Sequence, residues 1–114
     1  MAAEQQIEAR PRNWLTPVVL VILREESSYG YELMERLQED FAFEQISEGT
    51  LHRTLRRTEK EGLCKSEWET SEGGAARRMY SITEEGEAYL AAWAKACKQY
   101  QNVMDSFARA YTSR

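Results

Sequence analysis

The pattern of apolar and polar positions predicts four helices and one β-hairpin. Thr16 precedes Pro17 and a nearly all-apolar run that ends at Arg24, so we expect a buried first helix with Thr at the N-cap and Pro at N1. The Ser27-Ser28 pair is expected to cap a second helix. Apolar residues at helical spacing carry this second helix to about Asp40.

The third predicted helix has two chemically different faces. Ser47 is placed to cap it, and Gly62 is placed to end it. At about 100° per residue, Leu51, Leu55 and Thr58 share one stripe. The opposite face is basic and comprises Arg53, Arg56, Arg57 and Lys60, with His52 at its edge. A helix with one face in a core and the other densely basic can enter a DNA major groove.

A change from helical to period-two spacing predicts the hairpin. Residues 66–68 and 80–82 alternate in this way, and residues 70–74 between them have the composition of a turn. Thr83 is then expected to cap a last helix, which has acidic residues in its first turn.

The last helix carries an apolar seam at alternating spacings of three and four. Its members are Leu90, Trp93, Cys97, Tyr100, Met104, Phe107 and Tyr111. Such a seam over three heptads is typical of helix pairing. A domain of about 80 residues is too small to cover a helix of roughly 40 Å. We therefore predict a homodimer interface here, and the alternative is a helix folded back on its own domain.

Length and charge narrow the class of protein. The chain has 114 residues, 42% of them hydrophobic, and a net charge of −4. Residues 1–46 carry 9 acids and 4 bases, whereas residues 47–82 carry 6 acids and 7 bases. A local basic surface suffices for a specific DNA reader, so the overall negative charge does not exclude one.

No catalytic, metal or cofactor motif is apparent. His52 is the single histidine, and Cys64 and Cys97 are too far apart in sequence for a metal or CxxC motif. Redox sensing by either cysteine is a minor alternative. The polar N-terminus and the short apolar run Val18–Leu23 predict a cytoplasmic protein without a membrane segment. We do not expect an enzyme.

The order of elements predicts a mostly α fold with a small β-hairpin, a winged helix-turn-helix followed by a C-terminal dimerisation helix. The expected organisation is a flexible segment at 1–12, the DNA-binding domain at 13–83 and the dimerisation helix at 84–112. A three-helix bundle with an incidental hairpin would give the same elements. The basic third helix, and Arg77 and Arg78 beside the hairpin tip, favour the winged fold.

Several motifs together resemble the PadR family of bacterial transcriptional regulators, in its compact branch with a single C-terminal helix. They are SYGYEL (28–33), GTL (49–51), LRR (55–57), EKEGL (59–63), EGG (72–74) and RRMYSIT (77–83). Three further stretches, 13–17, 68–71 and 92–97, resemble the polyhydroxybutyrate-responsive repressors of Gram-positive spore-formers. This chain departs from the family at two positions. The family usually has Tyr where this chain has His52, and Leu or Met where it has Thr58. A buried Thr at position 58 would need a hydrogen-bond partner for its hydroxyl.

The third helix supplies most of the candidate DNA contacts. Arg53 and Arg56 are expected to read bases, because a recognition helix touches base edges through its N-terminal half and Arg pairs with guanine through two hydrogen bonds. We expect Arg57 and Lys60 to contact phosphates, although Arg57 also suits an ion pair with Glu61. The remaining candidates on this helix are Thr50, for phosphate or for capping, and His52, at a position that the resemblance associates with DNA.

The hairpin and the aromatic residues supply the other candidates. At least one of Arg77 and Arg78 should contact DNA, and strand alternation puts Arg78 on the side of Tyr80 and Ile82, which favours a structural role for one of them. Tyr29 and Tyr31 are expected to pack in or near the core. Trp14, Trp93 and Tyr100 occupy positions where the resemblance implies an effector cavity; aromatic core packing is the alternative for each.

The sequence thus predicts a repressor that binds a palindromic double-stranded operator as a homodimer. The chain has no separate ligand domain, so release should depend on an apolar or polymeric effector, polyhydroxybutyrate by resemblance. A winged-helix module that binds only protein or a granule surface is the alternative, and it would not need four bases on one helix face.

Overall fold

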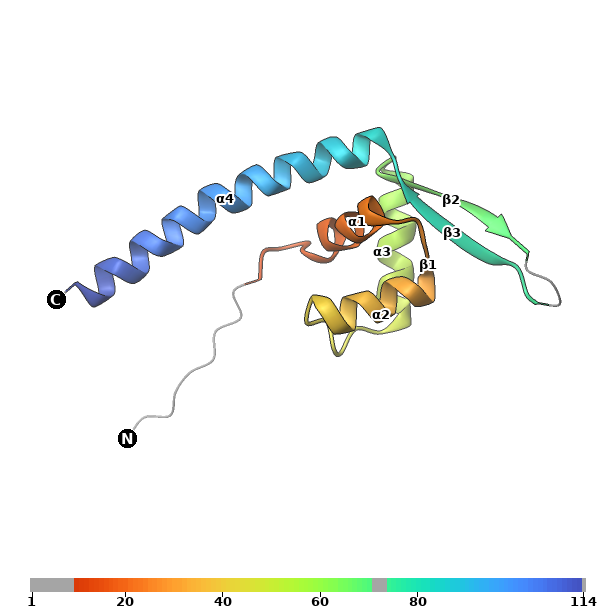
Figure 1. Cartoon of the computed structure of the whole chain (residues 1–114), viewed down its shortest axis with the longest axis horizontal. Helices are drawn as coiled ribbons and strands as arrows, with labels where there is room; N and C mark the ends of the chain where they lie inside the picture. Colours follow the sequence, from red (N-terminus) through yellow and green to blue (C-terminus); the bar gives the residue numbers. More distant parts are fainter. Residues whose placement is uncertain (1–9, 71–73, 114) are drawn as a thin grey trace.

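The computed structural model describes residues 10–70 and 74–113, and the chain folds as four helices and a three-stranded sheet (Figure 1). The elements are α1 (Leu15–Glu25), β1 (Ser28–Tyr29), α2 (Gly30–Asp40), α3 (Glu48–Lys60), β2 (Cys64–Glu69), β3 (Arg77–Ile82) and α4 (Glu84–Thr112). The sheet is antiparallel in the order β1-β3-β2. The predicted mostly α fold, a winged helix-turn-helix with a long C-terminal helix, is confirmed.

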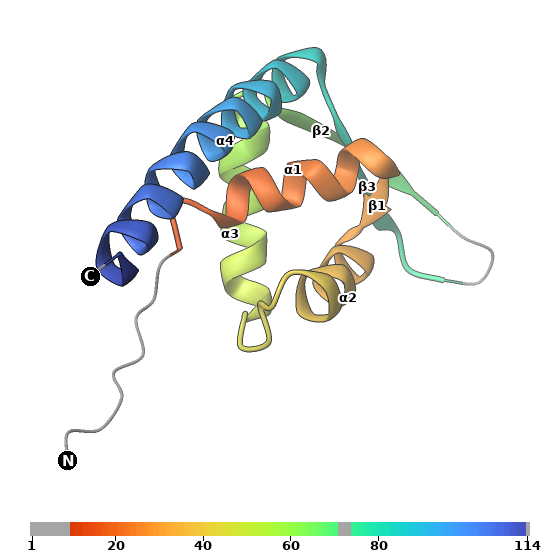
Figure 2. The ribbon, with the colours of Figure 1, turned by 60° about the vertical axis from the view of Figure 1, so that its left-hand side comes forward.

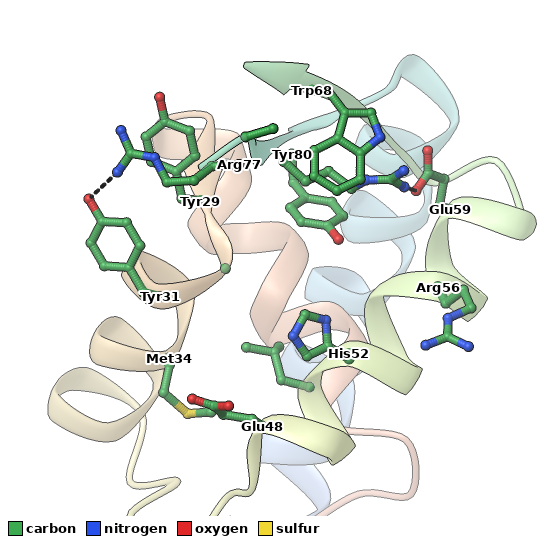
Figure 3. A pocket seen from close by; sticks show the side chains of 14 residues that line it. Tyr29, Tyr31, Met34, Glu48, His52, Arg56, Glu59, Trp68, Arg77 and Tyr80 are labelled. Atoms are coloured by element: carbon green, nitrogen blue, oxygen red, sulfur yellow. Dashed lines mark hydrogen bonds and ion pairs between the residues drawn. The ribbon is translucent and has the colours of Figure 1, made fainter. Parts of the chain in front are cut away.

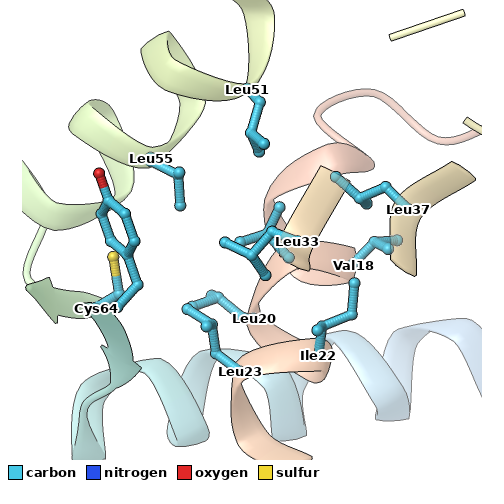
Figure 4. Packing of buried hydrophobic residues seen from close by; sticks show 11 residues of the cluster. Val18, Leu20, Ile22, Leu23, Leu33, Leu37, Leu51, Leu55 and Cys64 are labelled. Atoms are coloured by element: carbon cyan, nitrogen blue, oxygen red, sulfur yellow. The ribbon is translucent and has the colours of Figure 1, made fainter. Parts of the chain in front are cut away.

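One hydrophobic core joins the first three helices to the hairpin (Figure 4). Leu20, Leu33 and Leu55, from α1, α2 and α3, are fully buried in it. Each such side chain contributes about 1.5–3 kcal/mol through its burial. Cys64 of β2 and Tyr80 of β3 are buried in the same cluster. The hairpin is therefore an integral part of the domain, which rules out a three-helix bundle with an incidental hairpin.

The caps of α3 and α4 are those that the sequence predicts. The Ser47 hydroxyl accepts a hydrogen bond from the Thr50 amide at 3.1 Å, and the Thr83 hydroxyl accepts one from the Gly86 amide at 3.0 Å. Gly62 follows the end of α3 with a φ of 81°, a left-handed conformation that favours glycine. Side-chain capping chemistry thus fixes the starts of these two helices.

The predicted starts of α1 and α2 are wrong by one or two residues. Helix α1 has Trp14 at its N-cap, so Thr16 is buried within the first turn and Pro17 occupies N3, where no intrahelical N–H bond is needed. Helix α2 is capped at Tyr29, whose amide donates to Glu32 Oε1 at 2.9 Å. Ser28 lies in β1, a strand the sequence did not predict, because its pairing with Tyr80 is a tertiary contact.

Thr58 meets the requirement for a hydrogen-bond partner. It is fully buried, and its hydroxyl donates to the Thr54 carbonyl of the preceding turn at 2.6 Å. The polar atom is thereby satisfied within α3 itself, and the methyl group is available to the core.

Helix α4 begins in close contact with the end of α3. The Thr83 hydroxyl donates to the Gly62 carbonyl at 2.7 Å, and the Thr83 amide donates to the Leu63 carbonyl at 3.2 Å. A Cβ on Gly86 would lie 2.1 Å from the Leu63 carbonyl oxygen, so only glycine allows this approach. We call the contact of Gly62 and Leu63 with Thr83 and Gly86 the α3–α4 joint.

Only the first part of α4 packs on its own domain (Figures 1 and 2). Leu90 and Trp93 are partly buried there. Farther along the helix, large apolar side chains remain exposed: Tyr100 by 66%, Met104 by 52%, Phe107 by 74% and Tyr111 by 80%. The alternative of a helix folded back on its own domain therefore applies to the first half of the seam and not to the second.

Most of the predicted flexible N-terminal segment and of the predicted turn at the hairpin tip lies outside the described residues. Residues 1–9 of the predicted N-terminal segment and residues 71–73 of the hairpin tip are not among the described residues. Arg10, which is described, donates to the Ala42 carbonyl at 2.7 Å and lies 4.7 Å from the centre of the Phe43 ring. This residue is thus held against the α2–α3 loop.

Candidate nucleic-acid interface

The outward face of α3 presents three basic side chains at helical spacing. Leu51, Thr54, Leu55 and Thr58 are buried, whereas Arg53, Arg56 and Lys60 on the other side are exposed. Within the described part of the chain, none of these three forms an ion pair. Their charges are therefore available to an external anion.

Arg53 is positioned by the first turn of its own helix. Its Nη2 donates to the Thr50 hydroxyl at 3.3 Å, and that hydroxyl also accepts from Ser47 at 2.9 Å. A Cβ at Gly49 would lie 3.4 Å from Arg53 Nη1, so the guanidinium rests beside this glycine. Thr50 therefore takes part in the cap and orients Arg53, in agreement with the capping alternative.

Arg57 and Lys60 differ in their surroundings. Arg57 Nη2 donates to the Thr16 hydroxyl of α1 at 3.5 Å, and among the described residues it has no ion pair with Glu61. Lys60, in the last turn of α3, is exposed. Arg57 thus marks the edge of the basic face that adjoins α1.

A groove of about 550 Å³ separates α3 from the hairpin and the start of α2 (Figure 3). His52 and Arg56 line it from α3, Tyr31 from α2, and Trp68 and Arg78 from the hairpin. This groove joins the basic face of α3 to the wing, so the helix and the wing border one continuous surface.

Arg77 and Arg78 are held in different ways. Arg78 Nη1 lies 3.8 Å from Glu59 Oε1 of α3, and its guanidinium lies 4.6 Å from the centre of the Trp68 ring. Arg77 reaches toward α2, with its guanidinium 4.3 Å from the centre of the Tyr29 ring. The two side chains thus have different partners, Arg78 on α3 and β2 and Arg77 on β1 and α2, as strand alternation predicts.

The sequence interpretation missed three aromatic residues on this surface. Tyr31 is 59% exposed and stacks on Tyr29 with ring centres 5.9 Å apart, so it is not a core residue. Trp68 is 63% exposed and lies opposite Arg78 in the strand register. The hydrogen bond from Tyr29 to Glu69, at 2.7 Å, raises the pKa of the phenol. Pairing the two predicted strands would have placed Trp68 opposite Arg78, and that pairing was the signal in the sequence that could have identified Trp68.

A second pocket, also of about 550 Å³, lies between α1 and α4. Trp14 and Trp93 line it, with ring centres 5.6 Å apart. Tyr100, grouped with them by the sequence, is not among its lining residues, because it lies two helical turns beyond Trp93 on α4. The structure thus brings together two of the three aromatic candidates for an effector site.

The two cysteines occupy opposite environments. Cys64 is buried, and desolvation, aided by the charge of Glu59, raises the pKa of its thiol to about 12. Cys97 is exposed on α4 and borders the second pocket. A neutral, buried thiol does not suit redox sensing, so that alternative no longer applies to Cys64.

No helix among the described residues has both the length and the apolar character needed to cross a membrane.

Comparison with known proteins assigns the fold and the family. Residues 19–92 match the model of the transcriptional regulator PadR-like family. An uncharacterised protein from Lysinibacillus sphaericus is 30% identical over 98 residues, which cover 84% of this chain and 89% of the relative.

Solved structures agree with this assignment. A PadR family transcription regulator from Clostridium difficile has a TM-score of 0.76 and 30% identity, over 83% of this chain and 98% of the other. A PadR-like regulator from Bacillus cereus has a TM-score of 0.70 and 28% identity, over 83% and 91%. Bacillus subtilis PadR, solved in complex with operator DNA, shares the fold at a TM-score of 0.66 and 21% identity, over 73% and 47%. This chain belongs to the PadR-like family of transcriptional regulators.

Proposed function

We propose that this protein is a repressor that binds a palindromic DNA operator as a homodimer and is released by an apolar effector. The observation that carries the proposal is the exposed face of α3, where Arg53, Arg56 and Lys60 have no acidic partner among the described residues. Operator DNA bound to Bacillus subtilis PadR, which has the same fold, supports the same partner for this chain.

Base reading is assigned to Arg53 and Arg56. A recognition helix touches base edges mainly through its N-terminal half, where Arg53 lies, and Arg56 follows about one turn later on the same exposed side. A guanidinium can donate two hydrogen bonds to guanine. Lys60, Arg57 and His52 border this part of the helix and are assigned to the DNA backbone. The alternative of a plain solvated face is less satisfactory, because no carboxylate among the described residues forms an ion pair with any of the exposed bases of α3, Arg57 included.

Dimerisation is assigned to the outer half of α4. Exposed apolar side chains there include Tyr100, Met104, Phe107 and Tyr111, and a continuous apolar strip of this kind marks an association surface. Val103, exposed by 61%, widens the strip beyond a two-position seam. The wider strip favours an antiparallel contact between two copies of the helix, with the first seam residues, Leu90 and Trp93, near its margin.

The effector is assigned to the pocket between α1 and α4. Trp14 and Trp93 give it an aromatic wall, which suits an apolar ligand. Polyhydroxybutyrate or its short oligomers are the ligand class that the sequence resemblance suggests. Because the α3–α4 joint connects α4 to the recognition helix, a ligand that moves α4 would change the spacing of the two recognition helices in a dimer.

Replacing Arg53 and Arg56 together with Ala tests the proposal. We expect loss of specific binding to the DNA upstream of the protein's own gene, because each bidentate contact contributes roughly 1–3 kcal/mol of discrimination. Circular dichroism and light scattering should show an unchanged fold and assembly. A gel-shift assay measures the affinity, and an unchanged specific affinity in the double variant would exclude α3 as the reader.

A further inference from the structure

The two neighbouring arginines of the wing differ in whether their charge is already neutralised. Arg78 faces Glu59 at 3.8 Å and donates to Ser66 at 3.3 Å, and Glu59 itself accepts from the Ser66 hydroxyl at 2.9 Å. Arg78 thus connects β3 to α3 through an acid and a hydroxyl. The positive charge of Arg78 is therefore paired with the carboxylate of Glu59 within the protein.

Arg77 keeps its charge free for an external partner. Glu69 lies opposite it in the strand register, but a Glu69 oxygen accepts the hydroxyl of Tyr29 at 2.7 Å. Among the described residues no carboxylate lies within ion-pair distance of Arg77. The contacts of its guanidinium are with aromatic rings, at 4.3 Å from the centre of Tyr29 and 5.9 Å from that of Tyr31.

The two tyrosines hold this guanidinium in place without neutralising it. Their rings stack at an angle of 9°, and Arg77 Nη1 donates to the Tyr31 hydroxyl oxygen at 3.5 Å. Because that oxygen accepts from Arg77, its own proton is free to be donated elsewhere. The pair therefore offers a charged donor and a neutral donor side by side, at the point where the wing meets α2 (Figure 3).

We propose that Arg77 and the Tyr31 hydroxyl form a binding site for a backbone phosphate of the operator, and that Arg78 is a positioning residue that fixes the wing on α3. The inference rests on the proposed function, and it assigns the DNA contact to Arg77, a choice that the sequence left open. A phosphodiester carries the negative charge and the acceptor oxygens that such a pair requires.

The surroundings favour a DNA strand as the occupant. The groove that Arg77 and Tyr31 border also receives Arg56 and His52 from α3. Glu48 and Glu59 line it too, and Glu59 is paired with Arg78. Arg77 on the wing and Arg56 on the recognition helix still place a positive charge on each side of the groove, as expected for an extended polyanion that contacts both. Tyr29 supports this site in two ways. Its ring packs against the Arg77 guanidinium, and its hydroxyl donates a hydrogen bond to Glu69, the acid opposite Arg77 in the strand register.

The salt dependence of DNA binding distinguishes a phosphate contact from a structural role. The logarithm of the binding constant falls linearly with the logarithm of the salt concentration, with a slope of about −0.9 per phosphate neutralised. Fluorescence anisotropy would measure this slope on the upstream duplex and on an unrelated duplex of equal length. Arg77→Gln and Arg78→Gln form a matched pair, because each removes one charge from neighbouring positions.

For Arg77→Gln we expect about ten-fold weaker binding to both duplexes and a slope shallower by about 0.9 per bound protomer. Arg77→Lys should restore the slope, because it restores the charge. Tyr31→Phe should weaken binding severalfold without changing the slope, because only a neutral donor is lost. Arg78→Gln should lower the melting temperature and leave the slope unchanged.

Two results would overturn the inference while leaving the proposed function intact. One is an unchanged slope for Arg77→Gln, and the other is an equal loss of slope for Arg78→Gln. A melting temperature of Arg77→Gln close to that of the wild type would show that its effect on binding is direct. If the wild-type protein bound neither duplex, the proposed function would fail first, and this inference with it.

Discussion

The close packing of α4 on the end of α3 at Gly86 predicts a large loss of stability from one added methyl group. In Gly86→Ala the new Cβ would meet the Leu63 carbonyl oxygen at 2.1 Å and Ile82 Cγ1 at 2.7 Å. The oxygen belongs to the backbone and has no rotamer through which it can move aside. The start of α4 must therefore shift away from α3, which breaks the α3–α4 joint.

The magnitude follows from three contributions. Overpacking costs about 1–3 kcal/mol, and the upper end applies where backbone is struck. Loss of the hydrogen bond from Thr83 to Gly62 adds about 1 kcal/mol. The higher helix propensity of Ala offsets up to about 1 kcal/mol. A net loss of about 3 kcal/mol should lower the melting temperature by about 10 °C.

Two other glycines provide matched controls. A Cβ on Gly30 would meet nothing within 4 Å, so Gly30→Ala should be neutral or slightly stabilising. Gly62 also has open space, but its φ is 81°, so Gly62→Ala should cost about 1–2 kcal/mol through backbone strain alone. The expected order of stability is thus Gly30→Ala, then Gly62→Ala, then Gly86→Ala.

Urea denaturation followed by circular dichroism would measure the three variants. All proteins should be compared at one concentration, because the stability of a dimer depends on it. If the free energy of unfolding of Gly86→Ala lay within 0.5 kcal/mol of the wild-type value, the close packing of α4 on α3 would be refuted. The same result would remove the proposed route by which a movement of α4 reaches the recognition helix.

Three further predictions concern α4, the effector pocket and the thiols. Met104→Lys should give monomers by light scattering, because a charge at a packed helix surface must lose its water; a monomeric wild type at micromolar concentration would contradict the proposed dimer. Trp93→Ala should blunt the release of DNA by hydroxybutyrate oligomers more than it weakens DNA binding, and tryptophan fluorescence with a release assay would test this; no fluorescence change and no release of the wild type at saturating oligomer would exclude this effector. In the native protein at pH 8 Cys64 should not react with a thiol reagent, and it should react only in denaturant, since burial raises its pKa to about 12; two fast thiols in the native protein would contradict the buried position of Cys64.

Local sequence signals predicted the parts of the fold that local chemistry determines. Ser47 and Thr83 cap helices because their hydroxyls satisfy amides three residues away, and this can be recognised from sequence. The basic face of α3 follows from helical spacing alone. In contrast, β1 exists because Ser28 and Tyr29 pair with β3, a contact between residues about 50 positions apart.

The candidate site was predicted in part for the same reason. Strand alternation separated Arg77 from Arg78, but the acid that neutralises Arg78 is Glu59, on another element. The exposed position of Tyr31 depends on how α2 meets the hairpin, which its spacing within α2 does not determine. Tyr100 shares the seam of Trp93, yet it extends past the domain, because α4 is longer than the surface it covers.

The measurement that tests the central claim most directly is the salt dependence of wild-type binding to the DNA upstream of its own gene. Anisotropy titrations between 50 and 200 mM salt, beside an unrelated duplex, would give both the affinity and the slope. A repressor that reads this DNA through the α3 face should bind it far more tightly than the control and lose affinity steeply with salt. The absence of salt-sensitive, sequence-selective binding would contradict this function and favour a winged-helix module that binds protein alone.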